Sequence, residues 1–150
     1  MRGAGYIYKM QFDPNNKIVQ LCAQGMSFEG EGKTEKAYQL FQQTWNEASN
    51  DFEKFTSAHY VAWHQKTVID KLKWDETALH LALKIEDETM KAHYPSLYLN
   101  MAKSYEDLKD FDNAFKNYQS ALSFTNALPD DGYGKMIRSG IINGIERTTK

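Results

Sequence analysis

The side chains of this sequence best suited to chemistry are one cysteine, Cys22, and four histidines, His59, His64, His80 and His93. Histidine pairs that bind a metal from one helix usually lie four residues apart. His59 and His64 are five apart, so they point to different faces of a helix, and no cysteine or carboxylate stands at a matching spacing. Cys22 has no obvious base near it in the sequence and suits a small apolar role inside a helix. We therefore expect no metal, no cofactor and no catalytic residues, and histidines that are structural or line a groove.

A second candidate site is the stretch Ser27-Phe28-Glu29-Gly30-Glu31-Gly32-Lys33-Thr34, which ends in Gly-Lys-Thr. A phosphate-binding loop requires G-x4-G-K-[S/T] after a strand. Ser27 stands where the first glycine is needed, two glutamates would repel phosphate, and the preceding segment has a helical pattern. The stretch is therefore predicted to be a plain turn between two helices.

Composition and charge narrow the classes of function. A formal net charge of -2 and a pI near 6.1 provide no broad basic field for a polyanion, which argues against nucleic-acid binding. The single cysteine cannot form an internal disulfide. No apolar run approaches the length of a membrane span, and no signal-peptide pattern is present, so we expect a cytoplasmic protein without membrane partners.

The elements that must position these residues are helices, and the clearest helical pattern runs from Pro95 to Phe124. Apolar residues recur there every three or four positions, which places them on one face of each of two helices. Asp110 stands in the polar break between the two and is predicted to cap the second helix. The apolar residues are Tyr98, Met101, Ala102, Tyr105 and Leu108, then Phe111, Ala114, Phe115, Tyr118, Ala121 and Leu122.

This spacing resembles the tetratricopeptide repeat (TPR), a two-helix unit with the pattern W-x2-L-G-x2-Y, then A-x3-F, then P. The matching residues are Tyr98-x2-Met101-Ala102-x2-Tyr105 with Ala114-x3-Tyr118 and Ala121, and earlier Leu21-x2-Gln24-Gly25-x2-Phe28 with Ala37-x3-Phe41. The weakest match is Ala58-x2-Val61-Ala62-x2-Gln65.

The resemblance implies an all-α fold, a right-handed superhelix of three antiparallel helix pairs in a TPR-like solenoid. We expect a flexible N-terminal extension at 1–13 and one helical domain at 14–150. The predicted repeats are at about 15–49, 51–90 and 94–127, and a capping helix is predicted at 133–148.

The middle pair departs from the regular spacing. From Ala62 to Ala78 there are 16 positions, against 12 between the matching residues of the other two pairs. The excess is about one helical turn. We therefore predict a long first helix in this pair, which begins after the cap Asn50 and reaches to about Leu72, and Asp75 as the cap of the next helix.

Glycines inside helices predict close contacts between helices. A glycine in mid-helix costs about 1 kcal/mol relative to alanine, so Gly25 indicates a partner helix pressed against it. Gly140 and Gly144 are four residues apart, and we expect them to let the last helix lie close on the preceding pair.

The resemblance also implies a concave groove, lined by the first helix of each pair, that binds an extended or helical peptide. The groove residues carried over are Cys22, Met26 and Glu29, then His59, Trp63 and Lys66, and finally Leu99, Lys103 and Glu106. Trp63 falls off the packing stripe of its helix, and an aromatic residue outside the core is typical of an interface anchor. The alternative is that Trp63 covers the neighbouring helix. Cys22 and Met26 stand where a two-carboxylate clamp would need basic or amide side chains, which argues against that mechanism.

The expected function is a non-catalytic protein–protein interaction module or scaffold with a protein or peptide partner. A groove of three repeats is small, so we expect micromolar affinity, about -8 kcal/mol, unless the partner also covers the convex side or the protein forms a homodimer.

The alternative is an enzyme. The stretches AHYVAWHQ, SLYLNMAKSYEDL and LPDDGYGKM resemble short bacterial proteins, some labelled as rRNA adenine methyltransferases. The resemblance would imply a parallel-sheet domain with a glycine-rich cofactor loop and an aromatic-proline motif. Neither motif is present in this sequence. Saturable stabilisation by S-adenosylmethionine would favour the enzyme.

Overall fold

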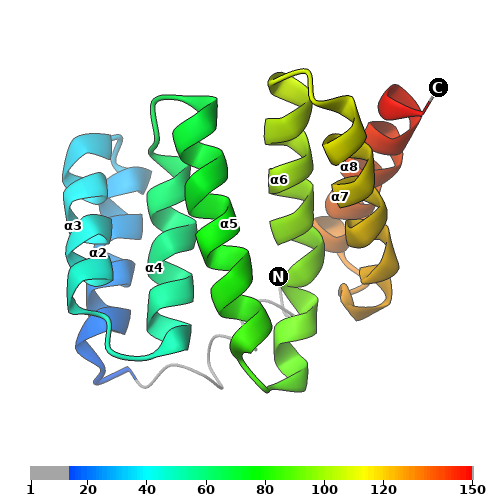
Figure 1. Ribbon diagram of the computed structural model, residues 1–150. Coiled ribbons are helices and arrows are strands. Elements are labelled where there is room, and N and C mark those ends of the chain that lie inside the picture. The colour runs from blue at the N-terminus through cyan, green and yellow to red at the C-terminus, as the bar shows by residue number, and fades with distance from the viewer. Residues whose placement is uncertain (1–13, 150) are drawn as a thin grey trace.

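The computed structural model describes residues 14–149, and this part of the chain is all-α (Figure 1). The extension predicted for 1–13 lies outside the described residues. Seven α-helices and two short 3-10 helices follow one another here: α2 (Lys17–Gly30), α3 (Thr34–Glu47), α4 (Asp51–Trp63), α5 (Val68–Lys84), η1 (Glu88–Ala92), α6 (Tyr94–Asp107), α7 (Phe111–Ser123), η2 (Thr125–Ala127) and α8 (Gly132–Thr148).

Consecutive helices pack against one another as sequential, antiparallel-like pairs. Each α-helix contacts the next one along the chain, and α6 also contacts α8. Figure 1 shows the same order in space, from α2 and α3 at one end to α7 and α8 at the other. The predicted all-α class and the pairing of neighbouring helices are thus confirmed. None of the helices within residues 14–149 has both the length and the apolar character needed to cross a bilayer.

Side-chain caps begin two helices where the sequence predicted them. The Asn50 side-chain oxygen accepts a hydrogen bond of 2.8 Å from the backbone amide of Glu53, at the start of α4. The Asp110 carboxylate accepts one of 3.3 Å from the backbone amide of Asn113, at the start of α7. Each cap satisfies an amide that the first helical turn leaves without an intrahelical partner.

The buried carboxylate of Glu53 joins the start of α2 to the turn between α3 and α4. It accepts hydrogen bonds of 2.9 Å from the backbone amide of Ser49 and 2.9 Å from the side-chain amide of Asn16, which itself caps α2. Burial acts to raise the pKa of Glu53, but these hydrogen bonds outweigh it and lower the pKa below its ordinary value. The carboxylate is therefore ionised where α2 and α4 meet.

The prediction of a long first helix in the middle pair was wrong. α4 ends at Trp63, and the additional turn lies at the start of the 17-residue α5. The Thr67 hydroxyl accepts a hydrogen bond of 3.1 Å from the backbone amide of Asp70, a Thr-x-x-Asp cap that begins α5 early. Asp75, predicted as the cap, is instead buried within α5 and paired with Lys71 at 2.6 Å.

Two glycines lie where neighbouring helices are in close contact, as the sequence predicted. A Cβ atom added at Gly25 on α2 would lie 2.7 Å from the ring of Phe41 on α3. One added at Gly144 on α8 would lie 2.2 Å from the ring of Tyr118 on α7. Gly140 is less crowded, because its Cβ would lie 3.4 Å from Leu99, an ordinary contact. A larger residue at Gly25 or Gly144 would therefore push the two helices apart, and one at Gly134 on α8 would collide with the backbone carbonyl of Pro129.

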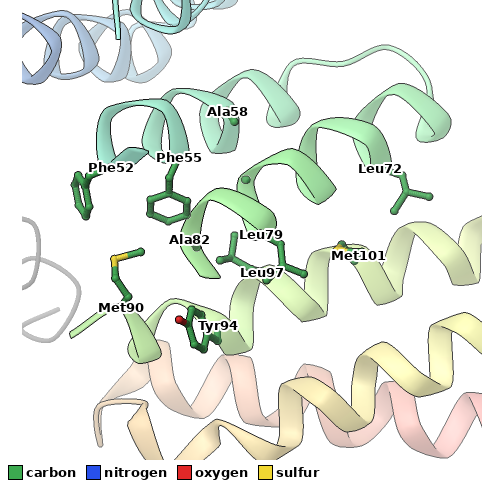
Figure 2. Packing of buried hydrophobic residues seen from close by; sticks show 11 residues of the cluster. Phe52, Phe55, Ala58, Leu72, Leu79, Ala82, Met90, Tyr94, Leu97 and Met101 are labelled. Atoms are coloured by element: carbon green, nitrogen blue, oxygen red, sulfur yellow. The ribbon is translucent and has the colours of Figure 1, made fainter. Parts of the chain in front are cut away.

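Three apolar clusters lie along the row of helices. The first joins α2, α3 and α4, the second joins α4, α5, η1 and α6, and the third joins α6, α7 and α8. Figure 2 shows the second cluster, in which Phe55, Met90 and Leu97 are almost fully buried. Because each cluster shares a helix with the next, the packing is continuous from α2 to α8.

The turns after α2 and α6 share one geometry. Gly32 (φ 78°) and Lys109 (φ 63°) both have left-handed backbone conformations. In each turn the following amide bonds back to the helix, from Lys33 to the carbonyl of Phe28 at 2.8 Å and from Asp110 to that of Tyr105 at 2.9 Å. This is the Schellman arrangement, which favours glycine. The Gly-Lys-Thr stretch is therefore an inter-helix turn, as predicted.

Replacing Lys109 by glycine is expected to stabilise the protein by about 1 kcal/mol, because glycine adopts the left-handed conformation without the steric cost of a Cβ atom. Gly32→Ala should destabilise it by a similar amount. Urea unfolding measures both changes. Lys109→Ala is the control and should change stability little, since alanine keeps the Cβ atom. Equal stability of the glycine and alanine variants at position 109 would contradict this interpretation.

Candidate functional site

A cavity of about 780 Å³ opens between alternate helices of the chain, α2, α4, α6 and α8. We call it the central cavity. α3, α5 and α7 each pack on the helix before and the helix after them, so they bridge the four lining helices and contribute no lining residue. The volume lies within the range of pockets that bind small molecules.

Six of the nine residues predicted for the groove line the central cavity, namely Cys22, Met26, His59, Trp63, Leu99 and Lys103. They come from α2, α4 and α6, the helices expected to form the groove. The structure therefore brings these six together around one hollow, although they span 82 positions of the sequence.

The other three predicted residues, Glu29, Lys66 and Glu106, are not among the lining residues. Glu29 lies 3.0 Å from the ring nitrogen Nε2 of His64. Lys66 is exposed in the turn between α4 and α5. The sequence pattern could not separate them from the lining residues, since they follow the same helical spacing.

Glu106 instead holds α8 on α6 and α7. Its carboxylate accepts hydrogen bonds from Arg147, at 2.8 Å from Nε and 3.1 Å from Nη2, and from the Tyr118 hydroxyl at 2.6 Å. The hydrogen bond from Arg147 is the largest influence that lowers the pKa of Glu106. Arg147 lies 41 positions away, so no local motif could have predicted this pair.

α8 supplies lining residues that the sequence reasoning missed. Tyr133, Met136, Ile137 and Gly140 all line the central cavity, whereas the sequence predicted only a cap. Their spacing repeats that of Tyr98, Met101, Ala102 and Tyr105. Those four residues pack between helices and do not line the cavity, so the spacing alone would have assigned the α8 residues to packing. By position, α8 stands where the first helix of a fourth pair would stand.

Trp63 has half of its surface exposed (51%) on the wall of the central cavity. Its indole meets the His59 ring at a centroid distance of 4.9 Å and the Tyr60 ring at 5.4 Å, both edge to face. Tyr60 is in turn stacked on Phe41 at 4.6 Å, and its hydroxyl lies 3.3 Å from the sulfur of Met26. Both ring partners of Trp63 belong to its own helix, so a fixed aromatic surface faces the cavity.

The described lining of the cavity is almost uncharged at neutral pH. It contains no aspartate or glutamate, and Lys103 is its one permanently charged residue. Burial lowers the pKa of His59 and of His93 to about 4, and for His59 the nearby charges of His93 and Lys71 act in the same direction. Burial also raises the pKa of Cys22 to about 11, so its thiol stays protonated and is a weak nucleophile.

Two polar atoms on the cavity wall have no hydrogen-bond partner within the described chain. They are the hydroxyl oxygen of Thr56 and the Nδ1 nitrogen of His59, and both atoms are buried. Thr56 as a whole is 2% exposed. Buried polar atoms in proteins nearly always have a partner, so these two atoms depart from the usual pattern.

Comparisons with known proteins found no matching family model, no similar curated protein and no similar solved structure. Within residues 14–149, no three histidine, cysteine, aspartate or glutamate side chains are grouped so that they could hold a metal ion. The interpretation of the central cavity therefore depends on its own geometry and chemistry.

The buried histidines predict a pH dependence of stability. An unfolded histidine has a pKa of about 6.5, whereas the folded values of His59 and His93 are about 4. Between these values the unfolded chain binds more protons, so the free energy of unfolding falls as the pH drops from about 6.5 toward 4. Each histidine contributes at most about 1.4 kcal/mol per pH unit.

A His59→Gln, His93→Gln double variant should lose less stability than the wild type between about pH 7 and pH 5. Urea unfolding at the two pH values measures the difference. His80→Gln is the control, because His80 is exposed on α5, and it should keep the wild-type pH dependence. An unchanged pH dependence in the double variant would show that these histidines are not buried in their neutral form.

Proposed function

We propose that this protein is a non-catalytic protein–protein interaction module that binds an extended or helical segment of a partner protein in the central cavity. The observation that carries the proposal is the lining itself: an open apolar cavity, built from four alternate helices, with an oriented and half-exposed Trp63 on its wall. Apolar side chains gathered on one accessible surface are typical of interaction sites, and tryptophan is prominent among residues that dominate binding energy.

Exposed methionines on the cavity support a protein partner. Met26 on α2 is 52% exposed and Met136 on α8 is 63% exposed, and both line the cavity. Methionine adapts its shape to different partners and is common at surfaces that bind peptide segments. Lys103 adds one cation at the same surface, which would favour a segment that carries an acidic residue beside its apolar ones.

The fold we propose is a TPR-like solenoid of three helix pairs, with α8 as the capping helix. Corresponding features of the first and third pairs support it. The left-handed turn residues Gly32 and Lys109 are 77 positions apart, and so are the buried rings Phe41 and Tyr118. An identical offset for a turn and for a packing residue is typical of internal repetition.

Trp63→Ala combined with Lys103→Ala should weaken binding of the physiological partner by about 30-fold or more, because removing an interface anchor commonly costs at least about 2 kcal/mol. The partner would be recovered by affinity capture with the wild-type protein, and its affinity for each variant measured by titration calorimetry.

The matched control is Ile69→Ala combined with Lys73→Ala, which removes an exposed apolar residue and a lysine from α5, outside the cavity. It should bind the partner as the wild type does. Equal affinities for the wild type and the Trp63 and Lys103 variant would show that the cavity is not the binding surface.

A further inference from the structure

Residues 6–12 of the chain have an alternating apolar pattern, and we call them the alternating segment. They precede residues 14–149, which the structure describes. In an extended chain every second side chain points to the same face. One face of this segment would therefore be wholly apolar, and the other would be mainly polar. The apolar face consists of Tyr6, Tyr8, Met10 and Phe12, and the opposite face consists of Ile7, Lys9 and Gln11.

The alternating segment joins the described chain at the N-terminal ends of two helices that line the central cavity. The side chain of Gln20 on α2 donates a hydrogen bond of 3.2 Å to the backbone carbonyl of Pro14. The side-chain amide of Asn16 donates one of 2.9 Å to Glu53 on α4. The first residue that lines the cavity, Val19, is five positions after Pro14. The point from which the segment extends is therefore fixed next to the cavity.

The length of the alternating segment suits the central cavity. An extended chain rises about 3.3 Å per residue, so the six steps from Tyr6 to Phe12 cover about 20 Å. The lining residues of α2 run from Val19 to Met26, which is about 10 Å along a helix. Phe12 is two positions before Pro14, so the apolar face begins within about 7 Å of the fixed point. The segment can therefore extend over the whole lined stretch without a long linker.

The apolar face of the segment also matches the lining in chemistry. The described lining contains no carboxylate, and Lys103 is its one permanent charge. The apolar face carries no charge, and Lys9 would stand on the opposite face, toward water. The exposed sulfur-containing side chains of Met26 and Met136 belong to the lining, and contacts between methionine sulfur and aromatic rings are favourable. The rings of the segment would thus meet suitable neighbours.

We propose that the alternating segment occupies the central cavity of its own chain, extended and with its apolar face toward the lining, and that it competes there with the partner. The competition rests on the proposed function, since the partner must displace the segment. A tethered segment has an effective concentration of about 1 mM. With an intrinsic Kd of about 0.1 mM it would fill the cavity about nine tenths of the time and weaken partner binding about tenfold.

The test compares two variants of the full chain by NMR of methionine methyl groups. The apolar-face variant carries Tyr6→Ser, Tyr8→Ser and Phe12→Ser. The matched control carries Ile7→Ser, Lys9→Ser and Gln11→Ser, three changes on the opposite face of the same segment.

Four methionines report the result. Met26 and Met136 line the central cavity, whereas Met90 and Met101 lie in the buried cluster of Figure 2 and show that the fold is kept. The apolar-face variant should shift the Met26 and Met136 signals, because it removes the rings packed against them. The control should leave both at their wild-type positions. Met90 and Met101 should be unchanged in both variants.

Unchanged Met26 and Met136 signals in the apolar-face variant would overturn the proposal, and so would equal shifts in the variant and the control. Wild-type signals that change on dilution would also overturn it, because they would assign the segment in the cavity to a second copy of the chain. These measurements contain no partner, so they test the docking of the segment independently of the proposed function.

The competition is tested by titration calorimetry with the partner. The apolar-face variant should bind it about tenfold more tightly than the wild type or the control does. Equal affinities of all three proteins would overturn the competition. Failure of the proposed function is recognised separately, by a partner that binds the Trp63 and Lys103 variant as tightly as the wild type.

Discussion

The close approach of a glycine to an aromatic ring, at each end of the row of helices, is the contact on which the rest of the structure depends. Gly25 brings α2 against the ring of Phe41, and Gly144 brings α8 against the ring of Tyr118. Both rings are fully buried. Because α2 and α8 are the first and last helices that line the central cavity, these two contacts set where its ends lie. The Tyr118 hydroxyl is also bonded to Glu106 at 2.6 Å, which fixes the ring against which α8 rests.

The cavity follows from the way the intervening helices pack. α3, α5 and α7 each use two faces, one toward the helix before and one toward the helix after, and so hold α2, α4, α6 and α8 side by side. A helix held from one side has part of its surface left for other contacts. Here that surface carries mainly apolar and aromatic side chains, together with a few polar ones such as Ser96 and Asn100 and a single lysine, Lys103.

Helical spacing predicted much of this arrangement and could not predict the rest. It separates packing positions from open ones on each helix, which is why six of the nine residues predicted for the groove line the central cavity. A glycine in mid-helix likewise indicates a close neighbouring helix. The spacing of the middle pair shows that it contains an extra helical turn, but it does not show which of the two helices has that turn. The Thr67 cap places the turn at the start of α5. The pairing of Glu106 with Arg147 and the lack of a partner at Thr56 and His59 depend on residues far away in the sequence, so only the folded chain reveals them.

The most direct measurement is to locate a bound segment on the protein. A peptide selected from a displayed library of random sequences, about twelve residues long, would be titrated into the isotope-labelled protein and followed by amide NMR. Binding in the central cavity predicts that the shifted amides lie on α2, α4, α6 and α8, around Met26, Trp63, Lys103 and Met136. Shifts concentrated on α3, α5 and α7 would contradict the assignment of the cavity as the binding surface.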